Sequence, residues 1–272
     1  MGRRTRVMGV INVTPDSFSD GGLFLDADKA IACGLEMARC GADFIDVGGE
    51  STRPGASPVS AEEELERVAP VITALRRQTD VLLSADTAKA AVAKWALEQG
   101  VEIINDISGL TSDPTIAKMT ARANAGLILM HMKGTPRTMQ KDPTYEDVVS
   151  EVRDFLAEAS SRAEAAGVAP DSILIDPGIG FGKSAEHNLQ LINRLESLSA
   201  LGKPILIGTS RKSFIGRLLG VPVEERIHGT SASVAASILR GAHVVRVHDV
   251  PEMIQVARLT DAILNETGAT SG

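Results

Sequence analysis

The chain has 272 residues, of which 43% are hydrophobic and 23% are charged, and its formal net charge at pH 7 is −7. This composition is typical of a folded globular protein, and the acidic balance argues against a nucleic-acid partner, which would favour a basic surface. No apolar run approaches the length of a membrane span, and the basic start "MGRRTRVMGV" lacks the apolar stretch of a signal peptide.

No linker or shift of composition divides the chain, which indicates one domain over residues 1–272 with flexible tails at 1–6 and 267–272. Cys33 and Cys40 lie on one expected helix, too far apart for a disulfide, and nothing in the sequence has the Cys/His spacing of a metal site. We therefore expect two buried, reduced thiols and a cytoplasmic location.

Eight short apolar runs rich in β-branched residues predict eight strands. In chain order they are residues 6–12, 43–48, 81–86, 101–107, 126–131, 172–177, 203–208 and 243–248. Longer segments with helical periodicity lie between them; segment 150–167 places Val152, Phe155, Leu156 and Ala159 on one stripe. Apolar strands that alternate with helices indicate a parallel sheet covered on both faces. Eight such units predict an α/β fold, a (β/α)₈ TIM barrel, with an open doubly wound sheet as the alternative.

Every predicted strand ends in polar residues. In chain order these are Asn12, Asp46, Asp86, Asn105 with Asp106, His131, Asp176, Ser210, and Arg246 with His248. Because the carboxyl ends of all strands of such a barrel meet on one face, we expect these residues to share one mouth. A turn or a helix cap is the simpler explanation for each one alone, and we prefer it for Asp106 and Asp249.

The acidic and amide residues at the strand ends form the first candidate set: Asp86, Asn105 and Asp176. Two carboxylates and an amide suit Mg²⁺ better than Zn²⁺, and they would equally accept hydrogen bonds from a flat heterocycle. Three apolar residues could stack such a ring: Ile107, Met130 and Phe181. The residue types alone leave both possibilities open.

The cationic residues form the second candidate set: Arg53, Lys212, Arg246 and His248. Residues 246 and 248 share one side of their strand, and arginine binds phosphate with paired hydrogen bonds, so we expect an anion site. We expect Arg211 on the surface and His131 packed in the interior, and we read His187 and His243 as structural. The turn "DPGIGFGKS" is not a P-loop; we expect close backbone approach to a ligand there, with Phe181 as a lid and Lys183 solvated.

Eight segments carry a resemblance to a known family. They are "MGVINVTPDSFSDGG", "FIDVGGESTRPGA", "SADT", "INDISG", "LMHMKGTPRTMQ", "LIDPGIGFGK", "GTSRKSFIG" and "GAHVVRVHDV". In this order they resemble the dihydropteroate synthases of bacterial folate synthesis, from about residue 7 to residue 262. The resemblance implies a transferase in which a dihydropterin with a methylene diphosphate loses diphosphate to 4-aminobenzoate and gives 7,8-dihydropteroate. It also implies Mg²⁺ as cofactor, sulfonamides as inhibitors and a homodimer.

The resemblance further implies roles for residues of this sequence. Asp86, Asn105 and Asp176 would hold the pterin edge beside Met130 and Phe181, and Lys212 would bond a pterin carbonyl. Asn12 would be the Mg²⁺ ligand, and Arg246 and His248 would bind the diphosphate with help from Arg53. The 4-aminobenzoate pocket would be shaped by Phe18, Thr52, Arg53, Pro54 and Ser213, and Val247 would also contact substrate. The catalytic residues would be Asp86, Asp176, Lys212, Arg246 and His248.

Two other functions stay open at this stage. A methyltetrahydrofolate methyltransferase module would share the acidic pterin pocket but would have no use for an anion site. A non-catalytic paralogue would bind pterin without turnover. For the homodimer, segments 224–240 and 250–265 are candidate contacts, with Val234 and Ile238 as exposed apolar positions unless they pack in the core.

Overall fold

The computed structural model of the chain describes residues 4–14, 23–53, 55–141 and 143–266, without the side chains of residues 23–26. In these residues, parallel strands form one sheet in the order β6-β5-β4-β3-β2-β1-β8-β7. The strands are β1 (Arg6–Asn12), β2 (Phe44–Gly48), β3 (Leu82–Asp86), β4 (Ile103–Asp106), β5 (Gly126–Met130), β6 (Ile173–Asp176), β7 (Leu206–Ile207) and β8 (Val244–Val247). Each lies within one of the apolar runs that predict it.

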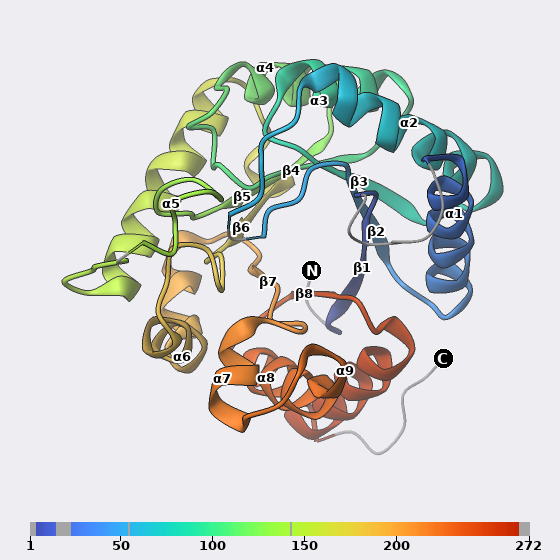
Figure 1. The fold of residues 1–272 in the computed structure, drawn as a ribbon. Coiled ribbons are helices and arrows are strands. Elements are labelled where there is room, and N and C mark those ends of the chain that lie inside the picture. Colours follow the sequence, from blue (N-terminus) through green and yellow to red (C-terminus); the bar gives the residue numbers. More distant parts are fainter. Residues whose placement is uncertain (1–3, 15–22, 54, 142, 267–272) are drawn as a thin grey trace.

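The sheet curls until its two edge strands meet. Ile175 of β6 forms a parallel bridge with Ile205, and its amide donates to the carbonyl of Pro204 at 3.0 Å. Figure 1 shows the strands in the middle of the molecule and the helices in a ring around them. The expected TIM barrel is therefore confirmed, and the open doubly wound sheet was the wrong alternative.

Helices follow the strands and cover the outside of the barrel. Those that the structure describes are α1 (Leu23–Arg39), α2 (Ala61–Gln78), α3 (Ala90–Glu98), α4 (Thr115–Arg122), α5 (Val148–Ala165), α6 (Ala185–Asn193), α7 (Ser213–Leu219), α8 (Ile227–Leu239) and α9 (Val250–Leu264). Local sequence fixes their starts: the Asp147 carboxylate accepts from the Val149 amide at 3.1 Å, and Ser184 forms a capping box with His187. His187 is thus structural, as expected.

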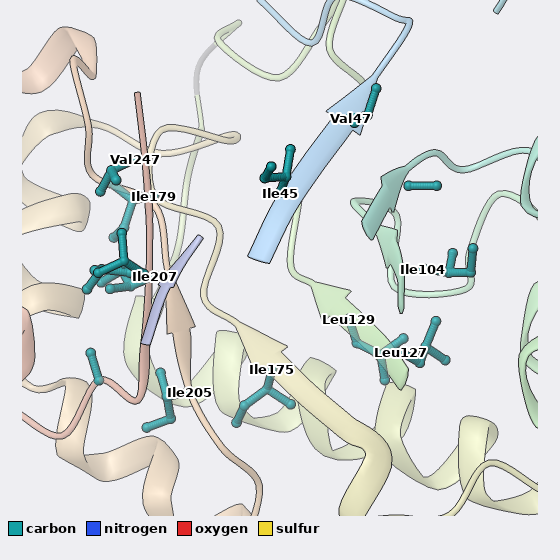
Figure 2. Packing of buried hydrophobic residues seen from close by; sticks show 14 of the residues in the cluster. Ile45, Val47, Ile104, Leu127, Leu129, Ile175, Ile179, Ile205, Ile207 and Val247 are labelled. Atoms are coloured by element: carbon teal, nitrogen blue, oxygen red, sulfur yellow. The ribbon is translucent and has the colours of Figure 1, made fainter. Parts of the chain in front are cut away.

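The two faces of each strand enter different apolar clusters. Outward-facing side chains such as Ile45, Leu129, Ile207 and Val247 pack between the barrel and the helices (Figure 2). Inward-facing side chains fill the barrel near the amino ends of the strands: Met8, Phe44, Ile103, Ile128, Leu174, Leu206 and Val244. The alternation of a strand therefore decides which residues reach the mouth.

Helix packing confirms one expectation, corrects a second and decides between two alternatives for a third. On α5, Val152, Leu156 and Ala159 are buried and Phe155 is half-buried, as the periodicity predicts. Cys33 is exposed, because the buried stripe of α1 runs through Ala30, Gly34 and Met37, and Cys40 is half-buried. Val234 and Ile238 of α8 are core residues rather than exposed positions.

The amino end of the described chain is held to the last helix. Thr5 donates from both its amide and its hydroxyl to the Asp261 carboxylate of α9, each at 2.7 Å. Residues 1–3 and 267–272 lie outside the described residues, and the tails stay a prediction there. Among the helices that the structure describes, none is long and apolar enough to cross a membrane.

Candidate active site

A layer of polar side chains lies above the apolar filling of the barrel. Strand alternation turns Asp46, Asp86, Asn105, Asp176 and Arg246 inward, on the same face of their strands as the inner apolar cluster. Asp86 and Asn105 are direct partners between β3 and β4, and Gly48 leaves the space that Asp86 uses, since a Cβ there would lie 3.3 Å from the Asp86 Cβ. Residues from five strands therefore meet at one end of the barrel.

Arg246 is the centre of this layer. Its Nε donates to Asp46 Oδ2 at 2.7 Å, and its Nη2 donates to Asp86 Oδ2 at 2.7 Å. The same Asp46 oxygen accepts from Asn105 Nδ2 at 2.9 Å. The sequence predicts an acidic set and a cationic set at one mouth, and the structure shows that they are in direct contact, since Arg246 lies among the carboxylates. The Asp46 carboxylate is fully buried and Arg246 and Asp86 are half-buried, so these charges are stabilised by opposite partners.

Asp46 is the residue of this layer to which the sequence assigned no role. Its side chain is fully buried, and it joins Arg246 to Asn105. The available signal was its position in "FIDVG", where alternation with the core residues Ile45 and Val47 turns it inward.

Burial raises the pKa of the two carboxyl groups nearest the mouth. For Asp86 the loss of solvent is the largest cause, and the Arg246 guanidinium opposes it. For Asp176 burial again comes first, opposed by a 2.7 Å hydrogen bond from the Gly178 amide and by the charges of Lys212 and Arg246. Asp176 and Arg246, which are 70 positions apart in the sequence, therefore belong to one electrostatic site.

An apolar wall and a lysine complete one side of the mouth. Met130, Met139 and Phe181 form a buried cluster, and Ile107 packs against it. The three residues expected to stack on a ring therefore lie together. Lys212 Nζ lies over the Phe181 ring, 4.1 Å from its centroid. Burial and the charge of Arg246 lower the pKa of Lys212 to about 8, although Asp176 and Asp86 oppose them.

His248 lies on the inward side of the chain just after β8. Its Nδ1 lies 3.0 Å from Ser210 Oγ, and that hydroxyl also accepts from the His248 amide at 3.2 Å. Burial, with the neighbouring charges of Arg246 and Arg211, lowers the pKa of His248 to about 4. The imidazole is therefore neutral at pH 7, and the expected cationic set has one charge fewer than its residue types suggested.

The comparisons with known proteins agree with this site. A family described as pterin binding enzyme matches residues 8–248. The chain belongs to this family of pterin-binding enzymes.

A dihydropteroate synthase of Synechocystis is 49% identical over 96% of this chain and 91% of its own. A Clostridium difficile dihydropteroate synthase, crystallised in the presence of pteroic acid, superimposes with a TM-score of 0.91 at 46% identity and covers 96% of this chain and 97% of that chain. A Yersinia pestis dihydropteroate synthase in complex with a sulfonamide drug also has a TM-score of 0.91, at 44% identity, covering 96% of this chain and 95% of that chain.

In this member of the pterin-binding family, the loop after β2 carries the residues expected near 4-aminobenzoate. Thr52 is half-buried and Arg53 is exposed. The Gly55 amide donates to the carbonyl of Pro136 at 3.2 Å, so this loop touches the loop after β5. Ser213, the first residue of α7, is exposed. Phe18 and Pro54 lie outside the described residues.

Several other candidates have structural positions. Val247 faces outward into the core between barrel and helices, so its side chain does not line the mouth (Figure 2). Asp106 accepts hydrogen bonds from the backbone of Ser108 and Leu110, which confirms the expected turn. Asp249 pairs with the exposed Arg211, and the expected surface position of Arg211 is confirmed. His243 Nδ1 accepts from the Ile205 amide at 3.1 Å and is structural.

His131 and Lys183 form a buried pair behind the mouth. His131 is packed, as expected, with its ring edge-on to Phe155 at 4.9 Å between centroids. Lys183 is only 2% exposed, so the expectation of a solvated lysine was wrong. Burial lowers the pKa of Lys183 to about 7, and three close acceptors in the turn and at the end of β5 hold its amino group inside.

The donor set at the mouth fits Mg²⁺ held mainly by substrate. Among the described residues, no cluster of three or more His, Cys, Asp or Glu side chains could cage a metal ion. Asn12 ends β1 half-buried on the inward side, with no side-chain hydrogen bond to another described residue. One free amide oxygen is a suitable ligand for an ion that keeps its waters and takes its other ligands from phosphate.

Proposed function

We propose that this chain is a transferase that condenses (7,8-dihydropterin-6-yl)methyl diphosphate with 4-aminobenzoate to give 7,8-dihydropteroate and diphosphate. The observation that supports it most is one barrel mouth that combines the acceptors Asp86, Asn105 and Asp176 with the cations Lys212 and Arg246. The similar enzymes crystallised with pteroic acid and with a sulfonamide support the same substrate class.

The acceptors suit the edge of a pterin. Its ring N–H and amino groups are donors, and carboxylates make charge-assisted hydrogen bonds to such groups. Because the side-chain N–H of Asn105 donates a hydrogen bond to Asp46, the Asn105 side-chain oxygen is left as an acceptor for the ligand. Lys212, fixed over Phe181, would donate to a pterin carbonyl on the other edge.

The cations suit the departure of diphosphate. The bond between the methylene carbon and the diphosphate oxygen breaks, and the electron pair leaves with the diphosphate. Arg246 and the exposed Arg53 would stabilise the charge of the leaving group, and His248 would donate an N–H to it. Asn12 would hold Mg²⁺, which when bound neutralises diphosphate charge.

The second substrate would approach from the loops. The lone pair of the 4-aminobenzoate nitrogen forms the new bond to the methylene carbon, and the nitrogen then loses its proton. Thr52, Arg53 and Ser213 would bind the benzoate, with Phe18 and Pro54 closing the pocket. Loop closure would also exclude water, which competes for the methylene cation.

A homodimer in the cytoplasm completes the proposal. Apolar side chains are exposed near the end of the chain: Leu239 on α8, and Leu259, Ile263 and Leu264 on α9. They lie in the two segments expected to form the dimer contact and replace Val234 and Ile238 as its candidates. The free cysteines Cys33 and Cys40 suit a reducing compartment.

Diphosphate release by the purified protein tests the proposed reaction. We expect turnover that requires both substrates and Mg²⁺, and competition between sulfonamides and 4-aminobenzoate. Asp176→Ala and Lys212→Ala should each lower kcat/KM at least a hundredfold while circular dichroism stays unchanged. Pterin binding without turnover in the wild type would identify a non-catalytic paralogue, and near-normal rates in the variants would contradict the pocket assignment.

A further inference from the structure

Lys183 is a buried titratable residue for which the proposed chemistry has no use. It lies in the turn that joins β6 to α6, and its side chain is 2% exposed. Burying a lysine is costly, and in a folded protein it is compensated by hydrogen bonds. The contacts of its ammonium group therefore show what it holds together.

Three acceptor atoms lie within hydrogen-bond distance of the Lys183 amino group. Nζ lies 2.9 Å from His131 Nδ1, 2.9 Å from the Phe181 carbonyl oxygen and 3.3 Å from the His131 carbonyl oxygen. Burial and the charge of Lys183 lower the pKa of His131 to about 2, so the neutral ring offers Nδ1 as an acceptor. Lys183 thus joins the end of β5 to the turn after β6.

The backbone of the turn packs tightly on the same segment. Gly178 and Gly182 have φ of 68° and 63°, in the left-handed region that favours glycine. A Cβ on Gly178 would lie 2.0 Å from the His131 carbonyl oxygen, and one on Gly182 would lie 2.4 Å from the Lys133 carbonyl oxygen. The turn therefore packs closely against the segment after β5, and the hydrogen bonds of Lys183 stabilise this contact.

The turn carries a wall of the mouth. Phe181 packs in the cluster with Met130, and the Lys212 ammonium lies over its ring. The Lys212 chain also runs close to Gly180, where a Cβ would lie 3.2 Å from Lys212 Cδ. A shift of the turn would move both the apolar wall and the ammonium group beside it.

We infer that Lys183 is a positioning residue for pterin binding, which acts through His131 and the Phe181 carbonyl to hold the Phe181–Lys212 wall of the pocket. The inference rests on the proposed function. It predicts an effect on the pterin side of the mouth and none on the 4-aminobenzoate side, because the loop after β2 has no part in these contacts.

Lys183→Met tests this inference, with Lys203→Met as the matched control. Lys203 is also largely buried, with 10% of its side chain exposed, but it pairs with Glu164 and the Pro170 carbonyl near the amino ends of β6 and β7. For Lys183→Met we expect at least a tenfold rise in the KM for the pterin diphosphate and in the calorimetric Kd for the pterin, since small misplacements of a site are costly. The KM for 4-aminobenzoate should stay within twofold, and Lys203→Met should leave both KM values within twofold.

His131 variants give a second test, which also serves if Lys183→Met fails to fold. His131→Leu removes the acceptor and should reproduce the loss of pterin affinity, whereas His131→Asn keeps an acceptor near Nδ1 and should recover most of it. The double variant Lys183→Met with His131→Leu should be no worse than either single one. Unchanged pterin affinity, equal losses for both substrates, or equal losses in Lys203→Met would overturn the inference. A wild type that binds no pterin would instead defeat the proposed function itself.

Discussion

Arg246 links the two kinds of charge in the mouth. Its guanidinium gives one N–H to Asp46 and another to Asp86, and arginine has five such donors in a planar fork. The remaining donors are available to an anion without breaking either pair. One side chain therefore pairs with two carboxylates and keeps other N–H donors for the proposed diphosphate contact.

Loss of Arg246 should destabilise the fold in a pH-dependent way. Burial raises the pKa of Asp86, so the folded state holds a proton at pH values where the unfolded state has lost it, and stability falls as the pH rises through that range. Without Arg246 the folded pKa rises further. In urea unfolding, the free energy of unfolding of Arg246→Met should fall by about 3–5 kcal/mol at pH 8 and by clearly less at pH 5.

The control is Arg211→Met, which breaks an exposed pair with Asp249. Its free energy of unfolding should fall by no more than about 1 kcal/mol. Equal losses of Arg246→Met at both pH values would contradict this assignment of the charges.

His248 should take up a proton when an anion binds. Its pKa in the free site is lowered to about 4, and a diphosphate beside it would raise the pKa again. A group whose pKa rises on binding strengthens binding as the pH falls. Calorimetry with inorganic diphosphate should therefore show a several-fold larger gain in affinity from pH 7.5 to pH 5.5 for the wild type than for His248→Gln. The variant controls for the titration of diphosphate itself, and the same gain in both proteins would exclude this role of His248.

Sequence reasoning at the residue scale worked where one rule decided the position. Their positions at the carboxyl ends of predicted barrel strands led us to expect Asp86, Asn105, Asp176 and Arg246 at one mouth, where the structure brings them together. This rule could not show that Lys183 is buried, because that depends on carbonyl groups brought by another strand.

At the scale of elements, the loop after β2 is held by an ion-pair network at its base. Glu50, near the start of the loop, accepts from Lys89 at 2.5 Å and from the Val59 amide near its end at 3.3 Å. Lys89 also pairs with Glu64 in the first turn of α2, a side chain that is 1% exposed. Three elements, β2, α2 and α3, thus fix the ends of the loop that carries Thr52 and Arg53.

Lys89→Met should therefore weaken binding of 4-aminobenzoate. The variant frees Glu50 and leaves the buried Glu64 carboxylate without its cation, so the loop loses its anchor. We expect the KM for 4-aminobenzoate to rise about three- to tenfold and the KM for the pterin diphosphate to change less than twofold. Lys94→Met, on the helix that Lys89 precedes and in an exposed pair with Glu98, is the control and should change neither. An effect confined to the pterin substrate would show that the network supports another part of the mouth.

The strands themselves were predictable, and their contacts through loops were not. Apolar runs identified all eight strands, but β7 pairs over only Leu206–Ile207, within the longer run 203–208. The contact between Gly55 and Pro136 joins residues 81 positions apart in the sequence, and no local pattern encodes it.

At the scale of the molecule, the barrel closes between β6 and β7, beside the site, through a single bridge among the described residues. Only the bridge between Ile175 and Ile205 and the hydrogen bond to Pro204 join β6 to β7 in the described chain. Asp176 is the last residue of β6, and Lys212 lies in the chain after β7. The distance between these two side chains therefore depends on how β6 and β7 close the barrel. Eight βα units predict that the barrel closes, but the register between β6 and β7 is set by packing of the whole ring.

The exposed apolar residues of α9 should form part of a dimer contact. Leu259 and Ile263 are four positions apart, so they lie on one face of the helix, and they are 66% and 63% exposed. Exposed apolar patches of this kind mark association surfaces. We expect the wild type to sediment at twice the chain mass at micromolar concentration, and Leu259→Asp with Ile263→Asp to sediment as a folded monomer. Leu218→Asp changes a residue of α7 that is 55% exposed, and it should leave the dimer intact. A wild type that stays monomeric at high concentration would remove this proposal, whereas dissociation by Leu218→Asp alone would move the contact to α7.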